Sequence, residues 1–504
     1  MRPPELTPVI VGVGEVTERR PEPGTAREPV DLMAAALRAA DEDAGGGWLP
    51  KLEALSLVGL ISWRYRDPVG LLCERLAITP ARAVNASMGG ETPIRLLHEA
   101  ALAIARGELT TAAFVGGEAS AAIAAAMKAG QAPDWTPAAS AEEAVRFPSS
   151  SFAVSPVAKA LGVRAPVQIY PFYEMATQAA WGQAPAAGEH ASAALWARYA
   201  AVAAENPGAW IRTAPKAEAI AAVTPDNRPI CWPYPKMMVA NMNVNQSAAV
   251  IVTSLAAARA AGVPEARLIH LWGGASAVEP EDYLKRDRYD HSTAQTAVLE
   301  AATGIAGGDA HAFRHLELYS CFPVVPKMAL KTLGLGAQAP APTVAGGLTF
   351  FGGPLNNYMS HAIAGMVRAL RAHPGELGLL YGQGGYVNKH HAVVVSTAPP
   401  PEPLALEISV QARADAERGP IPPLDEAYEG PATVETYTVR FGREGETQDG
   451  VVILRTPDGA RCMAQVPAED QASLATLLSR DRSAIGLTGR VSAGPDAPPR
   501  FAFT

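Results

Sequence analysis

The chain is poor in cysteine and has no long hydrophobic run, and each shortage excludes a class of protein. Its four cysteines, Cys73, Cys231, Cys321 and Cys462, are widely spaced and form no Cys-x-x-Cys pair. This spacing argues against a disulfide framework or a zinc site and favours a reducing compartment. No apolar run approaches the roughly 18 residues that span a bilayer, and the first one ends at Glu15, as a strand would rather than a signal peptide. We expect a cytoplasmic protein with no membrane partner and no metal.

Positive charge and aromatic residues are also scarce. The chain has 42 Lys and Arg against 50 Asp and Glu, a net charge of −8. Proteins that bind nucleic acid usually present a basic face, so we expect no nucleic-acid partner. Charged residues make up 18% and hydrophobic residues 48% of the 504 residues, which predicts a large buried core. Because aromatic residues make up only 6%, small residues must fill most of that core.

The distribution of strand-like and helix-like segments predicts four parts. Residues 1–120 alternate strands and helices, which is typical of an α/β sheet covered by helices. Residues 121–243 contain Ala-rich helical pieces, Pro-containing connectors and scattered aromatics, so we interpret them as an inserted domain. The alternation returns in residues 244–397 and echoes the first part, which indicates an internal duplication. A Pro-rich linker then leads to short alternating strands in residues 398–504, which predict a small β-barrel-like domain with no lysine and an acidic excess.

Five segments in one order together resemble the thiolase superfamily. Each carries a strand end or glycine turn at the position that family uses, namely residues 84–120, 245–254, 317–322, 346–362 and 378–385. The added C-terminal domain further resembles thiolase-like proteins of type 1. The resemblance implies an α/β fold of two mixed-sheet halves in five layers, α-β-α-β-α, followed by a small OB-like barrel.

The resemblance also implies a chemistry. In thiolases, a cysteine at a helix N-terminus takes the acyl group from an acyl-CoA, and a histidine in a Gly-His-Pro turn activates it. A second cysteine moves the proton at the α-carbon of the thioester, and two oxyanion holes stabilise the negative charge that develops. The implied ligand is therefore CoA or an acyl-CoA thioester, with no metal.

This sequence departs from the family at most of those positions. The nucleophile position falls on Met88, whose thioether cannot accept an acyl group, and Gly353 replaces the histidine of the Gly-His-Pro turn. Tyr319 stands where the family has Asn or His, and the final glycine turn, at Gly384, lacks its cysteine. We expect Met88, Gly352, Gly353 and Gly384 to lie against the CoA moiety. Tyr319 either donates a hydrogen bond to an oxyanion or fills the space beside Met88.

Three other positions have both a functional and a structural interpretation. Cys321 matches an acid/base cysteine of the sterol-carrier-type thiolases, but it also suits a buried structural thiol. His390 and His391 alternate along a strand, so at most one faces the pocket; we take His390 as the candidate base, with solvent exposure as the alternative. Asn356 either donates to a thioester oxygen or caps a helix.

Scattered basic residues of the insertion are the candidates for binding the CoA phosphates. Arg212, Lys216 and Lys236 either contact those phosphates or are simply solvated.

Together these departures predict an acetyl-CoA acetyltransferase-like protein of lipid metabolism that binds CoA or acyl-CoA without running the thiolase cycle. Two alternatives stay open. One is an active acyltransferase with rearranged catalysis through Cys321, and the other is a non-catalytic partner subunit or scaffold. The sequence also leaves open a monomer, a homodimer and a complex with a partner protein.

Overall fold

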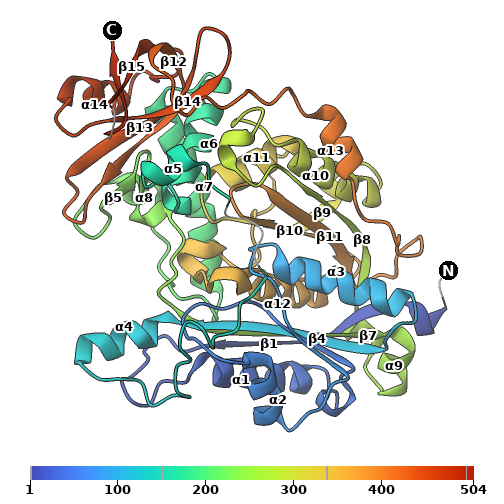
Figure 1. Ribbon diagram of the computed structural model, residues 1–504. Coiled ribbons are helices and arrows are strands. Elements are labelled where there is room, and N and C mark those ends of the chain that lie inside the picture. The colour runs from blue at the N-terminus through green and yellow to red at the C-terminus, as the bar shows by residue number, and fades with distance from the viewer. Residues whose placement is uncertain (1–2, 149–152, 337–338, 495–496) are drawn as a thin grey trace.

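The computed structural model describes residues 3–148, 153–336, 339–494 and 497–504, and its largest feature is a nine-stranded mixed sheet (Figure 1). In spatial order, its strands are β3 (Arg82–Asn85), β2 (Ala54–Leu57), β4 (Thr111–Ala119), β7 (Asn245–Ser254), β1 (Pro8–Thr17), β8 (Ile269–Val278), β11 (Lys389–Ser396), β10 (Leu377–Gly384) and β9 (Phe313–Leu318). Among the residues that the structure describes, the first and second halves of the sheet pair through two residue pairs between β1 and β8.

The two halves repeat one strand pattern. In the first half, β2 runs parallel to β4, and β7 runs antiparallel to both β4 and β1. In the second half, β9 runs parallel to β10, and β11 runs antiparallel to both β10 and β8. This repeat agrees with the internal duplication expected from the sequence. The sequence had suggested that β7 opens the second half. Because β7 pairs on both sides with strands of the first half, it instead completes that half.

Helices cover both faces of each half, and two of them lie between the two halves. The helices of this part are α1 (Pro29–Asp43), α2 (Pro68–Leu76), α3 (Thr92–Ala105), α9 (Leu255–Ala260), α10 (Thr293–Ile305), α11 (Val324–Thr332) and α12 (Tyr358–Ala372). Helices α3 and α12 contact each other and strands of both halves, whereas α1 packs on the first half and α10 on the second (Figure 1). The resulting α-β-α-β-α order confirms the five-layer fold. Every residue of α12 from Tyr358 to Val367 is buried, as expected for a helix that lies between two sheets.

The insertion lies beside these layers and is mostly helical. Its elements are α4 (Ser120–Ala129), α5 (Pro156–Ala160), α6 (Pro166–Ala180), α7 (Pro185–Glu205), α8 (Ala217–Ala221), β5 (Pro229–Cys231), β6 (Tyr234–Pro235) and the short helix η3 (Lys236–Met238). Proline occupies the first turn of α5, α6 and α7, where its missing N–H costs no helical hydrogen bond.

The C-terminal domain is a small closed β-barrel, as expected. Helix α13 (Gln411–Glu417) leads into it, and its elements are β12 (Gly430–Phe441), β13 (Thr447–Arg455), β14 (Arg461–Val466), α14 (Gln471–Leu477), β15 (Thr488–Gly494) and β16 (Ala497–Phe503). Strand β12 pairs with both β13 and β15, which closes the barrel. Strand β5 of the insertion adds to the same sheet beside β12, so the barrel and the insertion are joined by main-chain pairing.

The described ranges contain neither a helix that could cross a membrane nor a cluster of metal-binding side chains. No helix in them is long and apolar enough to cross a membrane. Nor do they bring together three or more His, Cys, Asp or Glu side chains in a group that could hold a metal ion.

Candidate functional site

The loop of Met88 lies between β3 and α3, at the start of the middle helix layer. The Met88 N–H donates to the carbonyl of Pro148 at 3.0 Å, and the Gly89 N–H donates to Asn356 Oδ1 at 2.9 Å. A Cβ at Gly59 would lie 2.7 Å from Met88 Cγ, so the thioether fits only because that position is glycine. Both amides that lead into α3 are therefore already bonded within the chain.

Asn356 holds two loops together. Its Oδ1 accepts from the Gly89 N–H, and its Nδ2 donates to the Gly59 carbonyl at 2.8 Å. The helix cap that we considered is not made here, because Asn357 is the residue before α12 and Asn356 precedes it. Asn356 thus fixes the distance between the Met88 loop and the loop that follows β2.

Cys321 lies just after β9 in a buried polar group. Its Sγ is 3.7 Å from Gln383 Oε1, and the Tyr170 hydroxyl donates to the same oxygen at 2.9 Å. Burial raises the pKa of the Cys321 thiol to about 12, so the thiol stays protonated near neutral pH. Among the described residues, no histidine hydrogen-bonds this thiol.

Tyr319 lies between the Met88 loop and Cys321. A side chain at Gly90 would collide with the Tyr319 hydroxyl and with the backbone of Gln383. The Tyr319 ring meets the Tyr358 ring edge to face, with centroids 6.2 Å apart. The structure therefore brings Met88, Tyr319 and Cys321 into one region, where the Tyr319 ring occupies space beside the loop.

His390 and His391 face opposite sides of the second half of the sheet, as strand alternation requires. His390 Nδ1 is 2.7 Å from the Tyr381 hydroxyl and its Nε2 is 3.2 Å from Ser292 Oγ, so it faces the side of α10. His391 Nε2 is 2.9 Å from Nδ1 of His98 in α3, so it is His391 that faces the middle layer. Burial lowers the pKa of His390 to about 4. The structure does not bring His390 into contact with Cys321.

The glycines expected at the ligand site serve close packing. Gly384 lies against the carboxylate of Glu91, and a side chain at Gly352, whose φ is 117°, would collide with Gln246. The Gly353 N–H donates to the carbonyl of Asn241 at 2.8 Å. The Gly-Gly-Pro turn is thereby attached to the last loop of the insertion.

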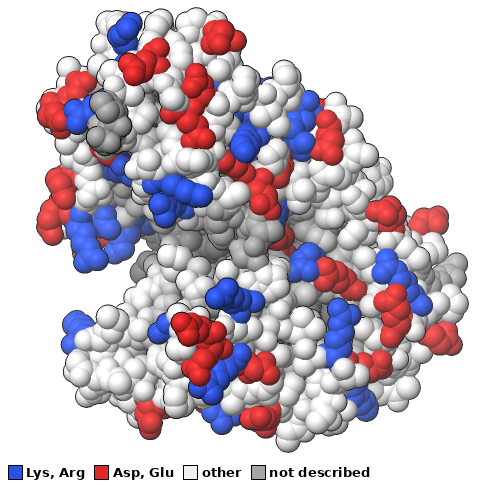
Figure 2. Space-filling view, viewed as in Figure 1, with Lys and Arg blue, Asp and Glu red and all other residues white. Residues whose placement is uncertain are grey.

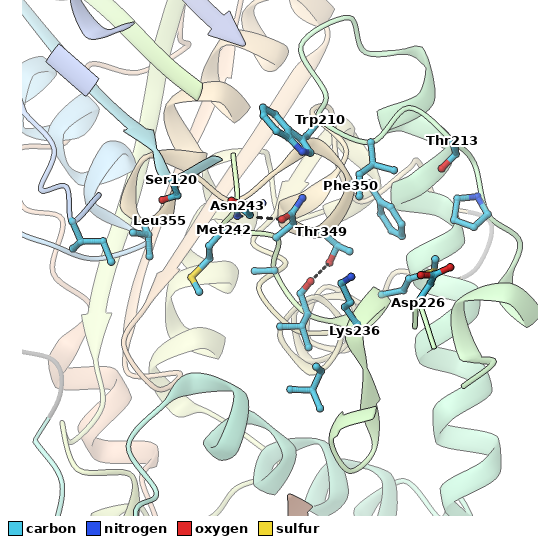
Figure 3. Close-up of a pocket in the computed structure, with 18 residues that line it drawn as sticks. Ser120, Trp210, Thr213, Asp226, Lys236, Met242, Asn243, Thr349, Phe350 and Leu355 are labelled. Carbon is cyan, nitrogen blue, oxygen red and sulfur yellow. Dashed lines mark hydrogen bonds between the residues drawn. The ribbon is translucent and has the colours of Figure 1, made fainter. Parts of the chain in front are cut away.

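A cavity of about 730 Å³ opens beside that turn, between the insertion and the first half of the sheet (Figure 3). Its walls include Trp210, Phe350 and Leu355, and Lys236 and Asp226 are its charged lining residues. Phe350 belongs to the short helix η7 (Gly347–Phe351), and Leu355 begins η8 (Leu355–Asn357). The cavity therefore ends one residue from Asn356, which holds the Met88 loop.

The surface around this region carries positive charge. Figure 2 shows a hollow at the left, between the parts labelled α8 and α4 in Figure 1, with Lys and Arg side chains along its upper margin. Of the three basic candidates, Lys236 lines the cavity, while Arg212 and Lys216 are exposed neighbours of the lining residues Ile211, Thr213 and Pro215.

Sequence reasoning missed several residues that shape this site. Glu118, at the end of β4, is buried and accepts hydrogen bonds from the N–H groups of Ile61 and Ser62, so it positions the loop at the cavity wall. Burial raises the pKa of Glu118 to about 7. The sequence signal for Glu118 was its position in the Gly-Gly-Glu motif at the end of a strand. No local sequence pattern predicted that the Tyr170 hydroxyl donates a hydrogen bond to Gln383.

The chain is similar to one family model over its C-terminal domain and to one solved structure over its whole length. The family model for the thiolase-like protein type 1 additional C-terminal domain matches residues 410–495. The crystal structure of a monomeric SCP2-thiolase-like protein type 1 from Mycobacterium smegmatis shares 30% identity with the chain, covers 100% of both chains and gives a TM-score of 0.83. No curated protein matches.

Two more distant structures share the fold alone. The dimeric peroxisomal thiolase of Saccharomyces cerevisiae is 12% identical, covers 79% of this chain and 98% of its own, and has a TM-score of 0.53. An acetyl-CoA acetyltransferase from Syntrophomonas wolfei is 13% identical, covers 78% of this chain and 99% of its own, and has a TM-score of 0.54. Both stop short of the full chain, whereas the Mycobacterium smegmatis protein matches all of it.

Proposed function

Because the chain belongs to the family of SCP2-thiolase-like proteins of type 1, we propose that it binds CoA or an acyl-CoA thioester without forming an acyl-enzyme at Met88. The proposed site is the cavity between the insertion and the Gly-Gly-Pro turn. The protein would then recognise a thioester without transferring its acyl group.

The cavity of Figure 3 is the observation that carries this proposal. Its volume of about 730 Å³ is within the range of pockets that hold organic ligands. Trp210 and Phe350 offer apolar walls to a pantetheine chain, and Lys236 offers a positive charge to a phosphate. The inner end at Leu355 leads toward the Met88 loop, where a thioester would end.

The surroundings of Met88 support binding without acyl transfer. A thioether has no S–H proton, so it cannot form the thiolate that acts as the nucleophile in this chemistry. An oxyanion needs free N–H donors at this point, but the N–H groups of Met88 and Gly89 donate to Pro148 and Asn356. Gly353 offers no imidazole to replace the missing base.

The alternative of rearranged catalysis through Cys321 has less support. A catalytic thiol needs a lowered pKa or a nearby base, whereas burial raises the pKa of Cys321 to about 12. His390, the base we had considered, instead bonds Tyr381 and Ser292. We therefore propose a structural role for Cys321.

Calorimetry tests the proposal. CoA and acetyl-CoA titrated into the wild-type protein should release heat at micromolar to millimolar concentration, and Lys236→Glu should weaken binding at least tenfold by placing a carboxylate beside the phosphates. Lys51→Glu is the matched control, because Lys51 is exposed on η2 (Leu49–Lys51), does not line the cavity and undergoes the same charge change. No heat at millimolar ligand, or equal losses in both variants, would refute the proposed site.

We also propose that the chain is a monomer in the cytoplasm. The Mycobacterium smegmatis protein is described as monomeric. All four cysteines are free thiols, which suits a reducing compartment. Light scattering after gel filtration should give the mass of one 52.6 kDa chain. A dimer mass, or recovery from the host with a tightly bound partner protein, would contradict the monomer.

A further inference from the structure

The cavity proposed for CoA differs in character between its two ends. In Figure 3, Lys236 and Asp226 lie on the right of the view, whereas Met242 and Leu355 lie on the left. Lys236 and Asp226 are the charged residues among the described lining residues, so the end with Met242 and Leu355 is uncharged. The phosphates were assigned to Lys236, and the uncharged end has no ligand group assigned to it beyond the thioester.

Ile61 is a large apolar residue that lines the same cavity although 59% of it is exposed. Its loop is fixed, because the N–H groups of Ile61 and Ser62 donate to the two carboxylate oxygens of Glu118 at 3.0 and 2.8 Å. Glu118 lies two residues before Ser120, which Figure 3 places on the side of Met242 and Leu355. Ile61 is therefore held in the wall at the uncharged end.

Met242 is the second exposed apolar residue of this wall, at 53%. Its loop is also fixed, because the Asn241 N–H donates to the Leu348 carbonyl at 3.0 Å and the Val244 N–H donates to the Met242 carbonyl at 3.0 Å. Single exposed apolar side chains are common on proteins, but those that gather around a cavity indicate a binding surface.

Leu355 completes the wall and has a strained backbone. Its φ is 45°, a left-handed conformation in which the Cβ of an L-residue crowds the backbone. The Leu355 N–H donates to the Gly353 carbonyl at 2.6 Å, and the next residue, Asn356, is bonded to Gly89 and Gly59. Such strain persists where the surroundings enforce it and is concentrated at functional sites. A leucine in place of the easier glycine therefore indicates that its side chain has a function in the cavity.

The region around Met88 offers no room for a long acyl group. A Cβ at Gly59 would lie 2.7 Å from Met88 Cγ and 3.2 Å from Phe147 Cγ, so both side chains pack against this backbone. In the part of the chain that the structure describes, neither Met88 nor Phe147 nor Tyr319 lines the cavity. An acyl chain that continues beyond a thioester near Leu355 must therefore follow the uncharged end of the cavity itself.

Building on the proposed CoA site, we propose that Ile61, Met242 and Leu355 bind the hydrocarbon chain of a medium-chain acyl thioester, and that the protein prefers such a chain to acetyl. An acetyl group would end near Leu355 and leave Ile61 and Met242 in water, whereas a longer chain covers them. Each methylene removed from water raises affinity about fourfold, so burial of two methylenes already raises it by roughly tenfold or more.

Calorimetry with acetyl-CoA and octanoyl-CoA tests this preference. Octanoyl-CoA should bind the wild-type protein at least tenfold more tightly than acetyl-CoA. Ile61→Ser and Met242→Ser should each reduce this ratio of affinities at least threefold. Ile421→Ser is the matched control, because Ile421 is also an exposed isoleucine but does not line the cavity, and it should leave the ratio unchanged.

Leu355→Asn separates the role of the side chain from that of the backbone. Asparagine adopts the left-handed conformation more readily than leucine, so this variant should fold, and it should reduce the ratio of affinities at least threefold. Ala77→Asn makes the corresponding change at φ 52°, at the C-terminal cap of α2 and away from the cavity. It should leave the ratio unchanged, and thermal unfolding shows that each variant is folded.

The same titrations distinguish this proposal from the one on which it rests. Equal affinities of octanoyl-CoA and acetyl-CoA would overturn the chain preference and leave the CoA site standing. A ratio that Ile61→Ser, Met242→Ser and Leu355→Asn all leave unchanged would place the chain elsewhere and overturn the assignment. Binding of neither thioester at millimolar concentration would refute both proposals.

Discussion

At the residue scale, the contacts of Met88 and Cys321 are those of packed and hydrogen-bonded groups. The amides of Met88 and Gly89 are bonded to Pro148 and Asn356. Cys321 keeps a thiol, but Gln383 and Tyr170 surround it and burial keeps it protonated. Both positions therefore serve packing and hydrogen bonding more than covalent chemistry.

Placing a cysteine at position 88 should not by itself produce acyl transfer. We expect Met88→Cys to gain no acetyl group from acetyl-CoA, because the N–H donors that would stabilise the oxyanion remain bonded and Gly353 supplies no base. Intact-protein mass spectrometry after incubation checks this. Alkylation of the new cysteine by iodoacetamide is the control for access, and a stoichiometric acetyl adduct would contradict the account.

Cys321 should react slowly with alkylating reagents. Since the thiolate is the reactive form and the pKa of Cys321 is raised to about 12, its rate should keep rising with pH up to about pH 10 without a plateau. Cys73, which is less buried, should react faster. Peptide mapping by mass spectrometry measures both rates, and a plateau for Cys321 near about pH 7 would show a functional thiolate.

At the scale of elements, local patterns predicted much of the fold, and contacts between distant segments were missed. Alternation along β11 predicted that His390 and His391 face opposite sides, and they do. The strand and helix alternation predicted the duplicated halves, and the short alternating strands predicted the added barrel; the fold confirms both. The pairing of β7 with β1 and the reach of Tyr170 to Gln383 depend on tertiary packing, which no local pattern records.

The contact between α3 and β11 should make stability depend on pH. Burial lowers the pKa of His98 from 6.5 to about 4. Between about pH 6.5 and pH 4, His98 is therefore protonated in the unfolded chain and neutral in the folded chain. Stability should therefore fall as pH drops, by about 2 kcal/mol for this residue between about pH 7 and pH 5. Urea unfolding at the two pH values measures it. His98→Gln should show a smaller pH dependence than the wild type, and an equal dependence would refute this assignment.

At the scale of the whole molecule, the C-terminal barrel is built into the rest of the chain. The guanidinium group of Arg461 is buried, bonds Glu435 within the barrel and donates to the carbonyl of Leu284 at 2.7 Å outside it. The Thr436 hydroxyl donates to the Phe172 carbonyl of the insertion at 2.6 Å. These contacts indicate that the barrel supports the insertion, and with it one wall of the cavity that we propose as the ligand site.

Removing the buried arginine should destabilise the whole chain. Arg461→Met leaves the Leu284 carbonyl without this donor and leaves the Glu435 carboxylate with Arg455 alone, which should cost about 1–3 kcal/mol of unfolding free energy. Arg490→Met, an exposed change on β15, should cost less than about 0.5 kcal/mol. Denaturant unfolding followed by tryptophan fluorescence checks both. A loss for Arg461→Met no larger than for Arg490→Met would mean that the barrel is only loosely attached.

The central claim is that a thioester is bound in the cavity between the insertion and the Gly-Gly-Pro turn and is not transferred to the chain. A crystal structure of the protein soaked with acetyl-CoA tests it most directly. The account predicts density for pantetheine between Trp210 and Phe350, with the phosphates near Lys236 and the thioester intact near Leu355. Density elsewhere with this cavity empty, or an acetyl group attached to Cys321 or another side chain, would contradict it.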